Sequence, residues 1–219
     1  MKSYELKRRF FEFFQKREHK QVPPAPILTS NPIQPFIASG LEPFEKYFSE
    51  ARDPINDPET RLNNQPIGAL NAVSGQYCFR PEDAGLVGDN SHLTFFEMLG
   101  TYTFGGYKKH TAIKVASDFF KNLNLFIDYV TVFGGDAGFS LDKDAEYMWK
   151  ELGVTYIQRL GLKENFWGPT GNGGVCGATS EIYLKDIGVW SIIFITYSFP
   201  GTHEELVSGK SLRKIERLY

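Results

Sequence analysis

The segment between Gln76 and Tyr107 constrains the fold most, because its pattern predicts two strands joined by a loop. The first run is rich in aromatic residues and ends at Arg80, where a polar, glycine-containing stretch over residues 81–91 begins. A second apolar run returns over residues 93–100. Two β-like runs around such a loop are typical of an antiparallel hairpin. The fold is therefore expected to contain at least one antiparallel strand pair.

The side chains of this hairpin suit a nucleotide. Neighbouring residues on a strand point to opposite faces, so Phe95 shares one face with Glu97, and Phe96 shares the other with Met98. An arginine such as Arg80 pairs with phosphate, a ring stacks on a base, and a carboxylate accepts hydrogen bonds from an amine or hydroxyl. The residues alone leave two alternatives open, which are a surface salt bridge for the arginine and a core position for the rings.

The rest of the chain mixes helical and strand-like periods. Helices are predicted over residues 4–19, 111–123 and 141–152, with Ser140 as the N-cap of the last. Strands are predicted over residues 129–133, 155–160, 180–184 and 189–197. Loops are predicted over the Pro- and Asn-rich residues 51–75 and the glycine-rich residues 165–179.

This mixed order differs from regular βαβ units and favours the α+β class, with a largely antiparallel sheet flanked by helices. Residues 1–219 are expected to form a single domain. No glycine-rich loop of the Rossmann or P-loop type occurs, so the sequence supports neither of those nucleotide-binding folds.

Charge and cysteine content narrow the possible partners and compartments. The formal net charge is −2, so no overall basic field attracts nucleic acid. Residues 108–110 (Lys-Lys-His) form a local basic stretch that either faces a nucleic acid or begins a solvated helix. Cys78 and Cys176 lie far apart and the histidines are scattered, so we expect neither a disulfide framework nor a metal site, which needs roughly four clustered ligands for zinc. No run reaches the ~18 apolar residues of a membrane span, and we expect a cytoplasmic protein without a membrane partner.

The hairpin strongly resembles motif 2 of the alanyl-tRNA synthetases, a family of class II aminoacyl-tRNA synthetases. Its second strand contains F-F-E-M-L-G, and a later segment contains N-F-W followed by C-G and S-E-I-Y. The matching segments, in the order of the family, are residues 4–19, 39–48, 76–107, 165–172 and 176–183. The resemblance spans nearly the whole chain and implies the class II synthetase fold, an antiparallel sheet flanked by helices.

The resemblance also implies an activity. Alanine and ATP would give alanyl-adenylate and pyrophosphate, with Mg²⁺ on the phosphates, and the alanyl group would pass to tRNA. Arg80 would be the catalytic residue and would hold the α-phosphate of ATP. The implied ATP contacts are Arg80, His92, Phe96, Glu97 and Met98. The implied amino-acid contacts are Trp167, Gly177 and Ser191, and no metal ligand is implied.

The sequence departs from the family pattern at three places. Both prolines of the family's G-P-C-G-P run are replaced in residues 174–178, and Ser191 stands where the family has Asn. The chain ends at Tyr219, about where motif 3 is expected, and residues 215–218 (Ile-Glu-Arg-Leu) only superficially echo the end of that motif. We therefore expect a catalytic domain that is incomplete at its carboxy terminus and that charges tRNA weakly or not at all by itself.

Two further expectations follow from these departures. The alternative function is a non-catalytic synthetase paralogue that binds a nucleotide or amino acid or acts as an interaction module. A missing motif 3 strand would leave the uncharged run over residues 189–197 with an unpaired edge. Because exposed edges pair with other chains, the chain is expected to form a homo-oligomer.

Overall fold

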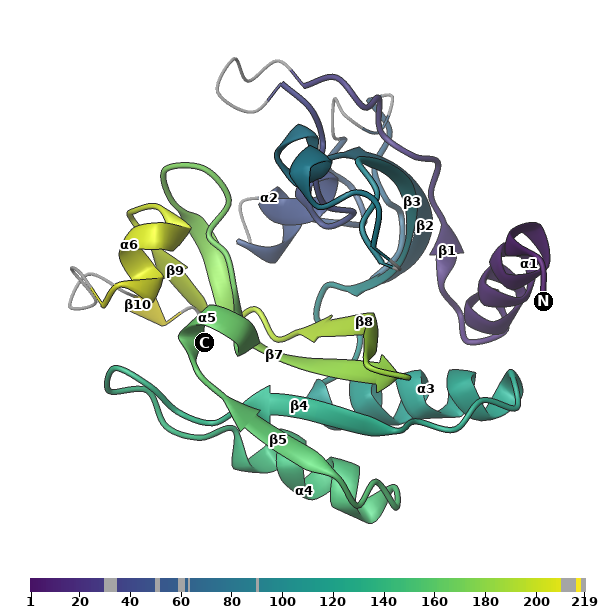
Figure 1. Ribbon diagram of the computed structural model, residues 1–219. Coiled ribbons are helices and arrows are strands. Elements are labelled where there is room, and N and C mark those ends of the chain that lie inside the picture. The colour runs from purple at the N-terminus through teal and green to yellow at the C-terminus, as the bar shows by residue number, and fades with distance from the viewer. Residues whose placement is uncertain are drawn as a thin grey trace. The chain divides into compact units, whose positions relative to one another are not determined.

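The computed structural model describes residues 1–29, 35–49, 52–58, 62, 64–89, 91–209 and 216–217 (Figure 1). The chain divides into two compact units, Met1–Gly106 and Tyr107–Tyr219, and each is described by itself. The predicted α+β class is confirmed, because each unit combines helices with a sheet rich in antiparallel pairs. No helix among the described residues has the length and apolar character needed to cross a membrane.

The first unit is built on the predicted hairpin. Its elements are α1 (Ser3–Gln15), β1 (Lys20–Gln21), η1 (Glu42–Phe44), α2 (Glu45–Phe48), β2 (Asn71–Phe79), η3 (Pro81–Gly85) and β3 (Phe95–Thr103). Strands β2 and β3 pair antiparallel from Asn71↔Thr103 to Phe79↔Phe95, and β1 joins β2 in parallel. Helix α1 packs on one face of this sheet. Its amphipathic period explains the packing, because its apolar side chains at helical spacing are the buried ones: Phe10, Phe13 and Phe14.

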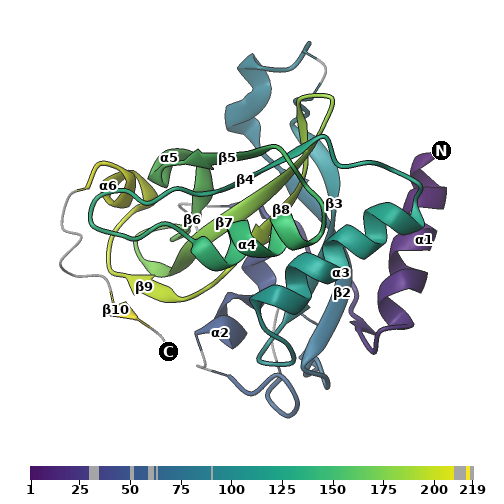
Figure 2. The ribbon, with the colours of Figure 1, turned by 90° about the horizontal axis from the view of Figure 1, so that it is seen from below.

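The second unit is a mixed sheet with two long helices on one face (Figures 1 and 2). Its helices are α3 (Lys109–Asn122), α4 (Lys143–Glu151), α5 (Leu162–Asn165) and α6 (His203–Val207). Its strands are β4 (Tyr129–Phe133), β5 (Ile157–Leu160), β6 (Phe166–Trp167), β7 (Gly174–Leu184), β8 (Ile187–Ile193), β9 (Tyr197–Phe199) and β10 (Glu216–Arg217). Of the stretch 215–218, Ile215 and Leu218 lie outside the described residues, and Glu216–Arg217 pairs antiparallel with β9.

Strand β7 organises this sheet because it pairs with four others. Its first half pairs with β6 and β9, and its second half pairs with β4 and β8, all antiparallel. Strand β5 extends the sheet beyond β4 in parallel. The main core lies between the sheet and the two long helices, where Val130, Val132 and Ile182 pack against Ile113 of α3 and Trp149 of α4.

Four local expectations were wrong. The predicted loop over residues 51–75 ends before Asn71, because β2 begins there and pairs with β3 from Asn71↔Thr103 onward. The glycine-rich residues 165–179 contain β6 and the first half of β7, because the glycines allow close backbone approach within the sheet rather than a loop. The run 189–197 is two strands, since the chain leaves β8 after Ile193 and enters β9 at Tyr197. The N-cap of α4 is Asp142, whose carboxylate accepts a hydrogen bond from the backbone of Ala145, and Ser140 lies outside the helix.

Candidate functional site

Arg80 is fixed at the end of β2. Its backbone N–H donates to Thr94 O at 2.8 Å, which continues the hairpin ladder, and its Nε donates to Ala38 O at 2.8 Å. The guanidinium carbon lies 5.1 Å from the centroid of the Phe96 ring. Among the described residues no partner holds its two terminal nitrogens. The side chain therefore presents two parallel donors in a fixed plane, which is the geometry that recognises phosphate.

Phe96 and Met98 lie on the same face of the hairpin as Arg80. They stand opposite Cys78 and Gln76 in the ladder, and both pack half-buried against the cluster that contains Cys78 and Ile37. Burial raises the pKa of the Cys78 thiol to about 11, so this cysteine is a packing residue rather than a nucleophile at neutral pH. The face thus combines a cation, a ring and an apolar wall.

The segment over residues 38–42 contains Ala38, whose carbonyl oxygen accepts the hydrogen bond from Arg80 Nε, and further hydrogen bonds fix this segment. The buried Glu42 carboxylate accepts hydrogen bonds from Ala38 N at 3.0 Å and Ser39 N at 2.8 Å. The Tyr102 hydroxyl donates to Gly40 O at 2.7 Å, and a Cβ on Gly40 would lie 2.8 Å from that hydroxyl oxygen. Sequence reasoning missed the role of Glu42, although a carboxylate within the apolar run around it was an available signal.

Glu97 lies on the opposite face of the hairpin. It stands opposite Tyr77 in the ladder and forms an ion pair with Lys7 of α1. On this face the exposed rings of Tyr77 and Phe95 stack with centroids 5.9 Å apart. The alternation expected from sequence is therefore present, and it separates Glu97 from Arg80 by the thickness of the sheet.

His92 belongs to the hairpin loop. Its backbone N–H donates to Asp89 Oδ1 at 2.7 Å, and its ring nitrogen Nδ1 contacts the other oxygen of the same carboxylate. The hydrogen bond from the backbone N–H of His92 is the largest cause of a shift in the pKa of Asp89. Together these bonds lower that pKa well below its usual range. Asp89 therefore sets the orientation of the imidazole before β3 begins.

The three predicted amino-acid contacts share one face of β7. Trp167 stands opposite Gly177 in the β6–β7 pair, and Ser191 stands opposite Glu181 in the β7–β8 pair. Since Gly177 and Glu181 are an even number of residues apart, all these positions face the same side. A Cβ on Gly177 would lie 1.9 Å from Phe194 O, so only glycine fits beneath the crossing chain.

Glu181 is a carboxylate that sequence reasoning did not assign to the site. Ser191 Oγ donates to its Oε1 at 2.8 Å, and the Thr179 side chain also forms a hydrogen bond with it. Burial raises its pKa above the usual glutamate range, and these two bonds only partly oppose the rise. A carboxylate within the otherwise apolar S-E-I-Y strand was the sequence signal that could have identified it.

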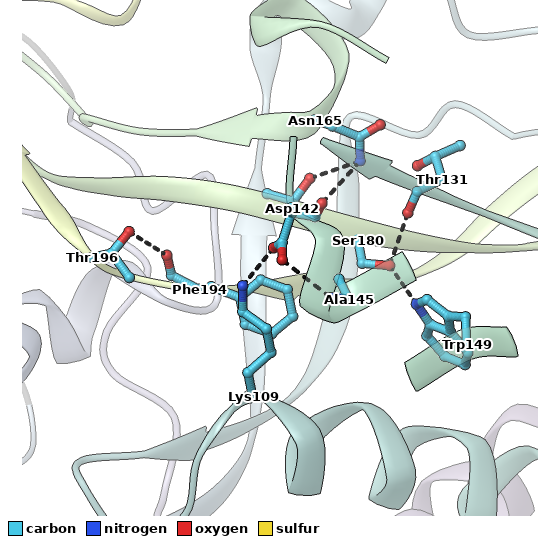
Figure 3. Close-up of polar contacts among 10 residues, drawn as sticks. Lys109, Thr131, Asp142, Ala145, Trp149, Asn165, Ser180, Phe194 and Thr196 are labelled. Carbon is cyan, nitrogen blue, oxygen red and sulfur yellow. Dashed lines mark hydrogen bonds and ion pairs between the residues drawn. The ribbon is translucent and has the colours of Figure 1, made fainter. Parts of the chain in front are cut away.

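The basic stretch over residues 108–110 begins α3, and its central lysine has a structural role (Figure 3). The Lys109 ammonium lies 2.6 Å from Asp142 Oδ2 and 4.5 Å from the centroid of the Phe194 ring. It therefore joins the start of α3 to the N-cap of α4. Lys108 and His110 are exposed.

The predicted residues fall into two groups. Arg80, Phe96 and Met98 share a face in the first unit, together with the loop residue His92, while Glu97 occupies the other face. The amino-acid contacts share a face in the second unit. Across the described ranges, no group of three or more His, Cys, Asp or Glu side chains is placed to hold a metal ion.

Comparison with known proteins places the sequence of this chain in a family. The family model described as tRNA synthetases class II (A) matches residues 5–191. The alanine–tRNA ligase of Rubrobacter xylanophilus is 40% identical over 84% of this chain, and that of Treponema pallidum is 35% identical over 84%. The alanine–tRNA ligase of Borrelia hermsii is 31% identical over 94%. The chain spans only 20%, 30% and 37% of the Rubrobacter, Treponema and Borrelia proteins, respectively.

Proposed function

The chain belongs to the tRNA synthetases of class II (A), and from this membership we propose that it forms the ATP- and alanine-binding part of an alanine–tRNA ligase. The observation that carries the proposal is the Arg80 guanidinium, which is anchored on Ala38 O and placed over the Phe96 ring. Similarity to three alanine–tRNA ligases supports alanine as the amino acid.

In the proposed reaction, an alanine carboxylate oxygen forms a bond with the α-phosphorus of ATP. The bond from phosphorus to the bridging oxygen breaks, and pyrophosphate leaves. Arg80 neutralises the charge that develops on the α-phosphate oxygens, and because its plane is already fixed, little reorganisation accompanies the step. Phe96 stacks on the adenine and Met98 forms the apolar wall beside it.

Two further residues of the hairpin take different parts in this proposal. His92 reaches the nucleotide from the loop, with Asp89 holding its ring. Glu97 faces α1, so a ligand on the Arg80 face does not contact it directly, and we propose that it acts by fixing the hairpin through Lys7.

Class II synthetases use ATP with Mg²⁺. Mg²⁺ is usually held by substrate phosphates, waters and one or two carboxylates rather than by a dedicated protein cage. The described residues contain no clustered metal ligands, so none of them is assigned to the ion and no step is derived through it.

The proposal also covers the second step of the reaction, which we assign to the whole ligase. Transfer of the alanyl group to tRNA is proposed for the whole ligase, in the cytoplasm, and the second unit supplies the amino-acid contacts Trp167, Gly177 and Ser191. We propose that residues 1–219 form one catalytic domain, with the two units as parts of it.

Calorimetry with ATP tests the role of Arg80. Charge-assisted hydrogen bonds to phosphate contribute about 1.5–3 kcal/mol, so Arg80→Ala should weaken ATP binding roughly 10- to 100-fold. Arg17→Ala is the matched control, because Arg17 also lies over a ring, that of Phe13, but on α1. Equal ATP affinity in the wild type and Arg80→Ala would refute the assignment.

Pyrophosphate exchange identifies the reaction. Exchange that depends on alanine and exceeds that with other amino acids supports the ligase. ATP binding that depends on Arg80, without exchange in the presence of any amino acid, would instead support a non-catalytic binding module.

A further inference from the structure

Glu42 is a buried carboxylate that the proposed reaction does not use. It is 6% exposed and stands at the first position of η1. One of its oxygens, Oε1, accepts hydrogen bonds from Ala38 N at 3.0 Å and from Ser39 N at 2.8 Å. Because burial of a charged carboxylate is costly unless hydrogen bonds compensate it, these two bonds stabilise the residue at this place. They also connect it to the backbone that contacts Arg80.

A single peptide group links this carboxylate to Arg80. This linking peptide lies between Ala38 and Ser39, and it consists of the Ala38 carbonyl and the Ser39 N–H. The carbonyl oxygen accepts a hydrogen bond from Arg80 Nε at 2.8 Å, and the N–H donates to Glu42 Oε1 at 2.8 Å. Because a peptide group is planar and trans, its N–H and C=O point in opposite directions. The Glu42 oxygen therefore fixes the direction in which the Ala38 carbonyl faces Arg80.

The charges at the two ends of the linking peptide strengthen this arrangement. An anion at the N–H and a cation at the C=O polarise the peptide in the same sense, and hydrogen bonds in such a chain reinforce one another. The carboxylate contacts the linking peptide, whereas the terminal nitrogens of Arg80 have no partner among the described residues. Glu42 can therefore orient the guanidinium while its two terminal nitrogens stay available for phosphate.

The chain on both sides of the linking peptide is fixed independently of Glu42. On one side, Ile37 O accepts a hydrogen bond from Phe79 N at 2.9 Å. On the other side, Gly40 O accepts one from the Tyr102 hydroxyl at 2.7 Å. Loss of the carboxylate should therefore leave this segment attached to β2 and β3, while the linking peptide between the two attachments becomes free to rotate. Such a rotation turns its carbonyl away from the guanidinium.

We propose that Glu42 is a positioning residue that directs the Arg80 guanidinium to the α-phosphate of ATP through the linking peptide. This assignment rests on the proposed function for the identity of the ligand, and it adds a residue that acts without touching the substrate. The alternative is that Glu42 only closes the turn before η1. In that case its loss would lower stability without a selective effect on the binding of phosphate.

Calorimetry on the full chain with ATP and adenosine separates these two roles. Adenosine carries the base and the ribose but no phosphate for Arg80 to bind. We expect Glu42→Ala to weaken ATP binding about 3- to 10-fold, the effect of one hydrogen bond, and to leave adenosine binding unchanged. Glu42→Gln keeps an oxygen acceptor and should restore ATP affinity to within about twofold of the wild type. Equal losses for ATP and adenosine in Glu42→Ala would overturn the inference, as would ATP binding in Glu42→Gln as weak as in Glu42→Ala.

A double-mutant cycle with ATP shows whether Glu42 acts through Arg80. If it does, adding Glu42→Ala to Arg80→Ala should cause no further loss of affinity, although each single variant binds ATP more weakly than the wild type. Additive losses would show that Glu42 affects the nucleotide by another route, and they would reject the positioning role.

Tyr102→Phe is the matched control for a general loosening of the segment. It removes another side-chain hydrogen bond of the same segment, the one to Gly40 O, and leaves both bonds of the linking peptide in place. It should lower stability and leave ATP affinity unchanged. A loss of ATP affinity equal to that of Glu42→Ala would assign the effect to loosening and would exclude a specific role for the carboxylate.

The Arg80 Nε–H resonance in NMR spectra measures the positioning without any ligand. The hydrogen bond to Ala38 O should slow its exchange with water in the wild type and in Glu42→Gln, and exchange should be about tenfold faster in Glu42→Ala. Where Glu42→Ala does not fold, Glu42→Asp takes its place in every measurement, because its shorter side chain withdraws the carboxylate by about 1.5 Å and keeps the charge. Unchanged exchange in the folded variant would contradict the proposed role.

The outcomes also distinguish this inference from the proposed function. ATP binding that depends on Arg80, with alanine-dependent pyrophosphate exchange but no effect of Glu42→Ala, would leave the proposed function standing and reject the positioning role. An Arg80 Nε–H whose protection depends on Glu42, in a chain that binds no ATP, would retain the positioning of the guanidinium and reject the proposed function.

Discussion

Gly177→Ala should destabilise the second unit by several kcal/mol. The added Cβ would lie 1.9 Å from Phe194 O and 2.8 Å from Phe194 C, and both are backbone atoms that cannot rotate away. The separation has to grow by about 1.5 Å before it reaches the 3.4 Å of an ordinary contact. Such a movement breaks the hydrogen bonds from Phe194 N to Ala178 O (2.9 Å) and from Thr196 N to Cys176 O (3.2 Å).

The magnitude follows from these losses. Two backbone hydrogen bonds contribute about 1–3 kcal/mol together, and overpacking adds about 1–3 kcal/mol of strain. The lower entropy of the unfolded alanine variant offsets about 0.4–1 kcal/mol. The expected net loss is therefore about 2–5 kcal/mol, a large share of a typical stability of about 5–15 kcal/mol.

Urea unfolding followed by tryptophan fluorescence measures this loss. All three tryptophans, Trp149, Trp167 and Trp190, belong to the second unit, so the signal reports on that unit. With a slope of about 1–3 kcal/mol per molar urea, the midpoint should fall by roughly 1–2 M. Gly188→Ala is the matched control on β8, because its Cβ would meet only the Tyr183 side chain at 3.4 Å, and we expect a change within about 0.5 kcal/mol. A Gly177→Ala midpoint equal to that of this control would refute the reasoning.

Three further predictions concern charge and assembly. The Arg159 and Lys150 side chains hold the pKa of Glu146 at about 2, below its ordinary value of 4.5, so its contribution to stability is complete above pH 4.5 and is lost as the pH falls toward 2. Glu146→Gln should remove that part of the pH dependence, about 1 kcal/mol because the cations are exposed, and an unchanged acid unfolding curve would contradict this. Glu97→Gln should change ATP affinity less than Arg80→Ala in calorimetry, since its carboxylate faces α1; an equal loss would show that it contacts the nucleotide. We expect self-association at high micromolar concentration that Val189→Lys weakens, because β8 pairs only with β7 among the described strands; a monomeric wild type in sedimentation would exclude it.

Much of the hairpin was predictable, because the alternation of side chains along a strand depends only on residues that are neighbours in the sequence. Alternation along β3 fixed which residues share a face, and the structure agrees that Phe96 and Met98 face away from Glu97. The spacing of apolar residues likewise predicted α1 and its buried phenylalanines. Resemblance to a family supplied the roles of Arg80 and Trp167, which the residue pattern alone left open.

The limits of sequence reasoning appear where glycine is involved. Residues 165–179 have the composition of a loop, yet they supply β6 and the centre of the sheet. The glycine content of a segment indicates how flexible its backbone is. The close contact at Gly177, however, is made by the backbone of Phe194, which belongs to a segment later in the chain. That contact has no local signature.

The sequence by itself determined the antiparallel hairpin, the helix periods, the α+β class and the family, since these follow from short-range patterns and motifs. Only the tertiary structure decided the partners: Lys7 for Glu97, Ala38 for Arg80, and Thr131 opposite Glu181 in the β4–β7 pair. The physical reason is that side-chain period fixes a face, while the partner on that face depends on strand order and register between segments far apart in the chain.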